Sequence, residues 1–253
     1  MPPAYYESDR ALSEYLLFHY GSEQEVLPGG IGPGDAVGFA IRCVTECVDR
    51  SIVPSGAVAL DLGCAVGRSS FELARFCDRV VGIDRSRRFI EAAREIQARG
   101  ALRFGCADEG ELQFEALARA PEGVDRSRVR FEEGDALNLR AGLGPFDIVL
   151  LANLIDRLAN PRLCLAQLDP LLNPRGQLVI VSPYTWLEEY TPRENWLGGF
   201  LKEGRSFKTL DGLREILTGS FELRGTKELP FLIREHSRKF QWGLAEASCW
   251  VRK

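Results

Sequence analysis

The feature that most constrains the fold of this chain is an apolar strand that passes through a glycine-bearing turn into a helix. It lies in the stretch VALDLGCAVGRSSFELAR at residues 58–75, and a second apolar strand, RVVGID, follows at 79–84. Residues 57–84 therefore form a strand–helix–strand unit of about 28 residues, the length that a right-handed crossover between parallel strands requires. Continuous apolar strands are typical of a parallel sheet covered on both faces.

Strand and helix patterns continue to alternate after this unit. A helical pattern ends at Gly100, strands are expected from 129 and over 146–155, and the strand GQLVIVSPY follows a helix that begins near Pro161. The two final strands, SFELRGTKELPFLI and LAEASCWVRK, leave no room for a helix between them and must pair as a hairpin. We predict a Rossmann-like α/β fold: a mostly parallel seven-stranded sheet with a C-terminal antiparallel hairpin and helices on both faces.

Length and composition favour a single domain over residues 1–253. A chain of 253 residues with 45% hydrophobic residues can bury one large core. Within it, residues 1–54 are expected to form an N-terminal helical lid or cap, and residues 55–253 the Rossmann-like core. A more polar stretch at about 101–128 interrupts the alternation, and we expect it to be a helical insertion.

The turn between the first strand and its helix indicates which ligand it holds. A dinucleotide-binding turn needs a glycine midway between Gly63 and Gly67, and here that position is Ala65, whose Cβ hinders close approach of a diphosphate. Asp84 ends the second strand, 23 residues after Asp61, where a carboxylate can accept hydrogen bonds from both ribose hydroxyls. Asp61 at the end of the first strand suits an ammonium and a sulfonium. Together these features favour S-adenosylmethionine.

Composition disfavours several other classes of partner and ligand. The formal net charge of −4, without a basic stretch, argues against nucleic acid. No apolar run is long enough for a membrane helix, and the polar N-terminus does not resemble a signal peptide. The seven cysteines are scattered without a C-x-x-C pair, which indicates reduced thiols and a cytoplasmic location. With two histidines in the chain, we predict no metal site.

Four motifs carry a resemblance to a known family: DLGCAVG, VVGID, EEGDA and FDIVLLANLIDRL. Through them, residues 55–185 resemble a class I S-adenosylmethionine-dependent methyltransferase, whose other product is S-adenosylhomocysteine. The resemblance implies a set of cofactor-binding residues along the ends of the strands. These are Asp61, Gly63, Cys64 and Gly67 around the methionine, Asp84 with Arg85 at the ribose, Asp135 and Ala136 at the adenine, and Asn153 below the sulfonium.

Three further stretches suggest the methyl acceptor: YYESDRALSEYLLFHYG, SPYTWLEEYTPRENWLGG and REHSRKFQW. They resemble the C-terminal methyltransferase domain of ovothiol biosynthesis enzymes. The resemblance implies methyl transfer to an imidazole nitrogen of 5-thiohistidine (4-mercaptohistidine), a small amino acid substrate, to give ovothiol A. In fused relatives an iron-dependent sulfoxide synthase precedes this domain. Here we expect a separate sulfoxide synthase and lyase to supply the thiohistidine.

Candidate acceptor residues lie in the aromatic and charged segment at 182–196, after the carboxyl end of a strand, and near the N-terminus. Aromatic rings could sandwich an imidazole, and an arginine could pair with a carboxylate. The predicted substrate-binding residues are Tyr5, Tyr184, Trp186, Arg193 and Asn195. The candidates for a base that removes a ring proton are His236, Tyr6 and Glu189, in no order, and a purely structural His236 is an equal alternative.

Three alternatives to this function remain open at the level of sequence. One is an S-adenosylmethionine-dependent enzyme with another small amine, thiol or carboxylate as acceptor. Another is a non-catalytic binding module on the methyltransferase fold. The third, a dehydrogenase, is the weakest because of Ala65.

Overall fold

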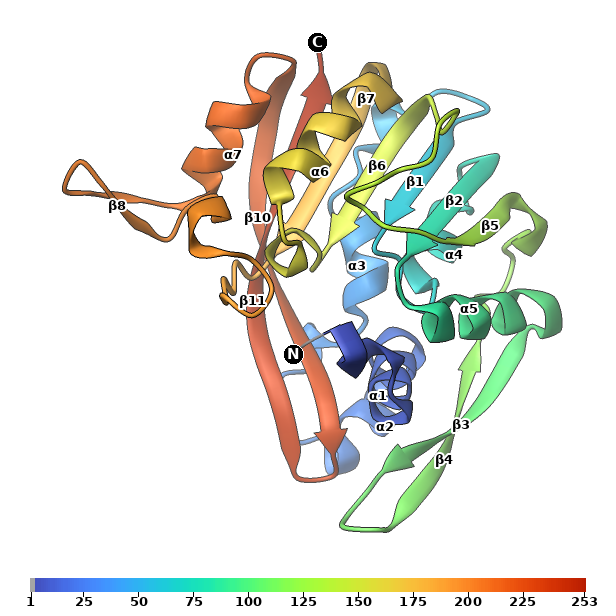
Figure 1. Cartoon of the computed structure of the whole chain (residues 1–253). Helices are drawn as coiled ribbons and strands as arrows, with labels where there is room; N and C mark the ends of the chain where they lie inside the picture. The colour runs from blue at the N-terminus through green and yellow to red at the C-terminus, as the bar shows by residue number, and fades with distance from the viewer. Residues whose placement is uncertain (1–2) are drawn as a thin grey trace.

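Seven buried strands form the centre of the computed structural model, which describes residues 3–253 (Figure 1). The strands are β1 (Val58–Leu62), β2 (Arg79–Asp84), β5 (Val129–Glu133), β6 (Phe146–Ala152), β7 (Leu172–Ser182), β10 (Phe221–His236) and β11 (Lys239–Arg252). Their order across the sheet is β10-β11-β7-β6-β1-β2-β5. The five strands from β7 to β5 are parallel, whereas β11 pairs antiparallel with both β7 and β10. The predicted fold is confirmed, including the C-terminal hairpin.

Helices cover both faces of the sheet because successive strand residues point to opposite sides. In β1, Ala59 packs into one apolar cluster with residues of three helices: α3 (Phe39–Thr45), α4 (Arg68–Leu73) and α5 (Arg87–Arg99). Leu60 packs into the opposite cluster with residues of α6 (Pro161–Leu168) and α7 (Thr209–Leu217). The arrowheads of β1 and β6 point toward the N-terminal helices, so these helices lie at the carboxyl edge of the sheet (Figure 1).

The N-terminal segment forms the predicted helical cap. Its principal helix is α1 (Asp9–Tyr20), which begins after Ser8 and ends at Gly21. The hydroxyl of Ser8 accepts a hydrogen bond from the backbone of Ala11. The helix α2 (Glu23–Val26) follows it. The shorter 3-10 helices are η1 (Pro3–Glu7), η2 (Pro28–Gly30), η3 (Gly34–Ala36), η4 (Arg50–Ile52), η5 (Arg126–Arg128), η6 (Ile155–Arg157), η7 (Asp169–Leu171) and η8 (Arg193–Asn195).

The insertion at 101–128 is not helical, and this expectation was wrong. It is an antiparallel hairpin of β3 (Ala101–Ala107) and β4 (Gln113–Arg119). Helix-forming residues such as Glu, Gln, Leu and Ala favoured a helix. In the structure, Cys106 and Ala116 are instead buried together with Leu17 of α1, and this packing stabilises the strands over the helix. The hairpin therefore supports the cap from outside the main sheet (Figure 1).

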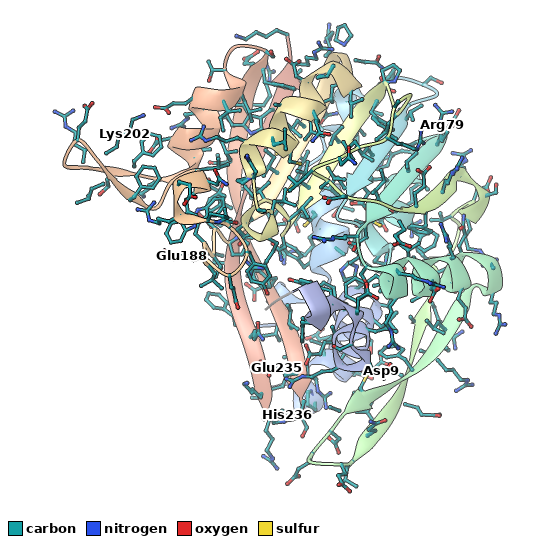
Figure 2. All side chains as sticks on the ribbon, viewed as in Figure 1. Asp9, Arg79, Glu188, Lys202, Glu235 and His236 are labelled. Atoms are coloured by element: carbon teal, nitrogen blue, oxygen red, sulfur yellow. The ribbon has the colours of Figure 1, made fainter. Side chains whose placement is uncertain are left out.

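Two further features extend beyond the sheet. The small hairpin of β8 (Phe200–Lys202) and β9 (Arg205–Phe207) projects to one side, with Lys202 at its end (Figures 1 and 2). The hairpin of β10 and β11 continues past the carboxyl edge of the sheet, and its far end lies beside α1. Over residues 3–253, no helix has both the length and the apolarity needed to span a membrane.

Candidate functional site

A cavity of about 460 Å³ lies where the parallel strands end and the N-terminal cap covers them. Such edges are where open α/β sheets bind their ligands. The strand side contributes the residues that follow β1, β2, β5 and β6, and the cap side contributes rings from η1, α1 and α3. The principal lining residues are Tyr6, Tyr15, Phe18, His19, Phe39, Leu62, Gly63, Ala65, Ser69, Asp84, Arg85, Asp135, Ala136, Asn153, Leu154, Arg157 and Tyr190.

The turn after β1 has the left-handed backbone that its glycines suggested. Gly63 and Gly67 have φ values of 77° and 86°, and Ala65 adopts φ of 47° without being glycine. A Cβ on Gly67 would overlap the ring of Phe131, so glycine is required there for packing. Gly63 and Ala65 line the cavity, whereas Gly67 and the buried Cys64 do not. Gly67 and Cys64 therefore support the conformation of the turn without lining the cavity.

Two carboxylates stand at the ends of β1 and β2: Asp61 is buried and Asp84 is half-buried. Asp84 lines the cavity, and its two oxygens accept hydrogen bonds from the backbone N–H of Ala65 (2.9 Å) and of Ser86 (2.8 Å). Asp61 lies outside the lining and accepts from the hydroxyls of Ser69 (2.7 Å) and Ser70 (2.6 Å). Burial raises the pKa of each carboxyl to about 6, and in Asp61 the charge of Asp84 adds to the effect.

The remaining predicted cofactor residues all line the cavity. Asp135 Oδ1 accepts from the backbone of Leu137 at 2.9 Å, which holds the loop containing Ala136. Asn153 follows β6 with φ of 51°, and its buried Oδ1 has no hydrogen-bond partner among residues 3–253. Because Asn153 lines the cavity, a ligand bound there can supply the missing donor. Arg85 lies at the wall beside Asp84.

The predicted acceptor residues after β7 do not reach the cavity. Instead they hold this segment to its neighbours: Trp186 Nε1 donates to Thr209 Oγ1 at 2.9 Å, and Asn195 Nδ2 donates to the Ala159 carbonyl at 2.8 Å. The Arg193 guanidinium lies 4.5 Å from the centre of the Trp196 ring, and the hydroxyl of Tyr184 donates to Glu246 at 2.9 Å. Of the aromatic residues of this segment, Tyr190 lines the cavity, whereas Tyr184, Trp186 and Trp196 do not.

Of the candidate bases, the cavity includes Tyr6 alone. His236 lies at the far end of β10, at the tip of the hairpin (Figure 2), and lines a separate pocket. Glu189 is exposed on the loop after β7 and does not line the cavity. Burial raises the pKa of Tyr6, so this phenol is neutral at pH 7 and serves as a hydrogen-bonding group.

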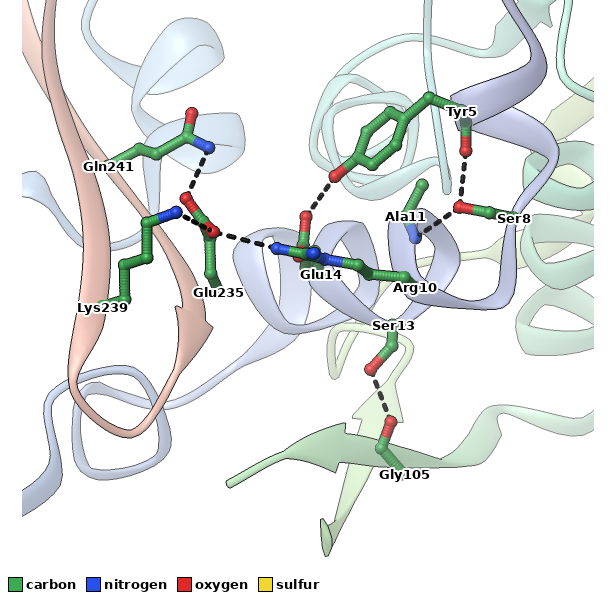
Figure 3. A network of polar contacts seen from close by, with 10 residues as sticks. All are labelled: Tyr5, Ser8, Arg10, Ala11, Ser13, Glu14, Gly105, Glu235, Lys239 and Gln241. Atoms are coloured by element: carbon green, nitrogen blue, oxygen red, sulfur yellow. Dashed lines mark hydrogen bonds and ion pairs between the residues drawn. The ribbon is translucent and has the colours of Figure 1, made fainter. Parts of the chain in front are cut away.

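Tyr5 belongs to a polar network on the outer side of the cap rather than to the cavity (Figure 3). Its hydroxyl donates to Glu14, and Arg10 bridges Glu14 (2.7 Å) and Glu235 (2.9 Å). Lys239 also pairs with Glu235, at 2.8 Å. The carboxylates are largely buried while Arg10 is exposed, so this network ties α1 to the tip of the β10–β11 hairpin.

The cavity residues that were not assigned to the site from the sequence include Tyr15, His19, Arg157 and Tyr190. Tyr15 and His19 lie on one face of α1 at helical spacing, which is visible in the sequence. Arg157 directly follows the residues NLID after the fourth parallel strand of the chain. His19 Nδ1 is buried without a hydrogen-bond partner among the described residues. Burial, with the nearby charge of Arg68, lowers the pKa of His19 to about 3, so its ring is neutral. The described residues contain no cluster suited to a metal ion.

Comparisons with known proteins agree with this geometry. A family model described as a methyltransferase domain matches residues 54–207. The O-methyltransferase cnsE of Penicillium expansum is 29% identical over 142 residues, which are 56% of this chain and 43% of that protein, so the chain spans less than half of that relative.

Two solved structures share the fold. The N-methyltransferase NodS of Bradyrhizobium japonicum WM9, in complex with S-adenosyl-L-homocysteine, is 16% identical with a TM-score of 0.55, covering 97% of this chain and 98% of NodS. The [4+2]-cyclase SpnF is 13% identical with a TM-score of 0.58, covering 99% of this chain and 94% of SpnF. At these identities, similarity extends to the fold and not to the reaction.

Proposed function

The chain belongs to the methyltransferase domain family, and we propose that it methylates an imidazole nitrogen of 5-thiohistidine, the step that forms ovothiol A. S-adenosylmethionine is the methyl donor and S-adenosylhomocysteine the second product. The observation that carries the proposal is the composition of the cavity: acids line or adjoin its strand side, and aromatic rings line its cap side.

The residues of the strand side fit S-adenosylmethionine. Asp84 keeps lone pairs for the two ribose hydroxyls after accepting from Ala65 and Ser86. The unpaired Oδ1 of Asn153 needs a donor, which the ammonium of the cofactor or a methyl-acceptor group can supply. Asp61 and Asp84 favour a cationic ligand, and S-adenosylmethionine carries both an ammonium and a sulfonium.

When bound, S-adenosylmethionine supplies an electrophilic methyl carbon on its sulfonium. The protein's task is then to align the acceptor nitrogen with that carbon and to exclude water. Phe18, Phe39 and Tyr15 cover the cavity from the cap side, which keeps water out and presents flat surfaces to a ring. The neutral His19 can accept a hydrogen bond from a ring N–H and so orient the second nitrogen, with its lone pair, toward the donor.

Mass spectrometry tests the acceptor directly. The protein is incubated with S-adenosylmethionine and 5-thiohistidine, and a parallel reaction contains histidine. We expect a product heavier by one methyl group with the thiol compound alone. If S-adenosylmethionine binds by calorimetry but neither reaction yields a methylated product, thiohistidine is rejected as the acceptor while the cofactor assignment stands.

A second candidate function is methyl transfer to a hydroxyl group. It is favoured by the similarity to cnsE, which is named as an O-methyltransferase. A panel of small phenols and hydroxy acids, screened with the same mass readout, separates it from the leading proposal. Binding of S-adenosylmethionine without turnover of any acceptor would favour a non-catalytic role or another reaction, as the cyclase SpnF illustrates for this fold.

A further inference from the structure

We propose that Arg157, together with the hydroxyls of Tyr6 and Tyr15, forms a subsite that binds a carboxylate of the methyl acceptor. The inference rests on the proposed function, since it concerns the molecule that receives the methyl group. It replaces the expected role of Arg193, which packs on Trp196 outside the cavity.

The distribution of charge in the cavity points to Arg157. Among the described lining residues, the cations are Arg85 and Arg157, because His19 is neutral. Arg85 directly follows Asp84 and so belongs to the strand side of the cavity. Arg157 is on η6, the element after β6, and lies close to Tyr6 of the cap. Its positive charge acts on the Tyr6 hydroxyl and opposes part of the rise in pKa that burial causes. The cation on the acceptor side is therefore Arg157.

The guanidinium of Arg157 is held rigidly, as a specific carboxylate site requires. Its Nη1 donates to the backbone carbonyl of Asp156, to Asp156 Oδ2 and to the Thr185 carbonyl, each at 3.0 Å. Asp156 is fully buried, and its Oδ2 also accepts from the Thr185 backbone at 2.9 Å. The ring of Tyr190 lies 4.9 Å from the guanidinium carbon. These three bonds all use Nη1, and the hydroxyl of Tyr6 is a further hydrogen-bond partner of the guanidinium.

Two tyrosine hydroxyls complete the subsite. Tyr6 and Tyr15 line the same cavity, with ring centres 5.9 Å apart and edge to face. Burial keeps both phenols protonated, since it raises the pKa of each. The Tyr6 hydroxyl accepts hydrogen bonds from Tyr15 and Arg157, so the three groups meet at one part of the wall, and a carboxylate bound there would accept from them in place of Tyr6. Charge-assisted hydrogen bonds of this kind favour an acid over its neutral amide by roughly 10- to 100-fold.

The test compares acids with their amides for binding to protein loaded with S-adenosylhomocysteine. The probes are 5-thiohistidine with 5-thiohistidinamide, and 4-hydroxybenzoate with 4-hydroxybenzamide, measured by calorimetry. Because removal of Arg157 alone leaves Asp156 buried without its partner, the main variant is the double substitution Arg157→Gln with Asp156→Asn. Arg157→Lys and Tyr6→Phe are the milder variants, and Arg193→Gln is the matched control.

We expect wild type and Arg193→Gln to bind at least one acid about tenfold or more tightly than its amide. The double variant should lose that preference, and Arg157→Lys and Tyr6→Phe should reduce it. Any of three results would overturn the subsite. Wild type could bind acid and amide equally, the preference for the acid could survive in the double variant, or neither acid could bind. Binding of hydroxybenzoate without methylation of thiohistidine would reject the proposed acceptor and support the subsite. Equal methylation of thiohistidine and its amide would support the proposed acceptor and reject the subsite.

Discussion

The backbone N–H of Ala65 donates a hydrogen bond to Asp84 Oδ2 over 2.9 Å, which joins the turn after β1 to the acid at the end of β2. Ala65 makes this bond from a left-handed conformation, with φ of 47°. The turn and the acid therefore form one unit, and a change in either is expected to alter the binding of S-adenosylmethionine.

Replacement of Asp84 by Asn should weaken both cofactor binding and the turn after β1. The amide keeps the shape of the side chain but offers a single acceptor atom, so affinity for S-adenosylmethionine should fall roughly 10- to 100-fold. The amide nitrogen would also face one of the two backbone N–H groups that donate to the carboxylate, so the cofactor-free protein loses a hydrogen bond of the turn, at a cost of about 1–3 kcal/mol that the removal of the charge offsets in part. Calorimetry and chemical denaturation measure the two effects, with the exposed Glu115→Gln as control. An unchanged affinity would contradict the assigned ribose contact.

Replacement of Ala65 by Gly should stabilise the turn. A residue with a Cβ costs about 1 kcal/mol at positive φ, and glycine does not. The gain in native-state energy is offset in part by the greater freedom of the unfolded chain. Ala65→Val should instead destabilise the protein and weaken cofactor binding, because a β-branched side chain is poorly accommodated in this conformation. Thermal unfolding with and without S-adenosylmethionine checks both variants. Equal melting temperatures for the glycine and valine variants would contradict the strain at this position.

Binding of S-adenosylmethionine should release protons near pH 6. Burial raises the pKa of Asp61 and Asp84 to about 6, and a cationic ligand favours their ionised forms. Affinity should therefore fall as the pH drops below 6, and the heat of binding should depend on the ionisation enthalpy of the buffer. S-adenosylhomocysteine lacks the sulfonium charge and should release fewer protons. The absence of any buffer dependence at pH 6 would argue against charged acids next to the bound cofactor.

Loss of Glu235 should loosen the cap. Its carboxylate pairs with Arg10 of α1 and Lys239 of β11 (Figure 3), so Glu235→Gln weakens the link between α1 and the hairpin. The largely buried position of Glu235 suggests a cost of about 1–3 kcal/mol in unfolding free energy. Amide hydrogen exchange should rise in α1 and stay unchanged in β1 and β6. Glu222→Gln, which removes an exposed pair with Arg224, is the control.

The strands and the cofactor side of the cavity could be predicted because they depend on local patterns. Parallel strands end at one edge, so the acid after β2 had to face the turn after β1. The acceptor side depends on the path of the chain after each strand. Arg193 lies among aromatic residues in the sequence and Arg157 does not, yet the structure shows that Arg157 lines the cavity and Arg193 packs on Trp196.

The hairpin of β3 and β4 was missed for a related reason. Its residues favour a helix when considered alone, and the contact of Cys106 and Ala116 with Leu17 selects strands. Likewise, the spacing of His19 is that of one position on the apolar face of an amphipathic helix. No local pattern reveals that this residue lines a cavity.

The final prediction concerns His19 and the dependence of stability on pH. In the native protein the pKa of His19 is about 3, whereas an unfolded histidine has its ordinary value near 6.5. Below pH 6.5 the unfolded chain therefore binds a proton that native His19 does not, so His19 lowers stability as the pH falls toward 3. At pH 5 this amounts to about 2 kcal/mol.

Asp61 and Asp84 act in the opposite direction, since their raised pKa values stabilise the native protein as the pH falls from about 6 toward 4. His19→Phe should remove the acid-sensitive term and increase stability at pH 5 relative to pH 7. Denaturation at both pH values measures this. In assays with 5-thiohistidine, His19→Phe should lower kcat/KM about tenfold through the loss of the Nδ1 acceptor. A stable variant with full activity would show that the unpaired nitrogen does not contact the acceptor.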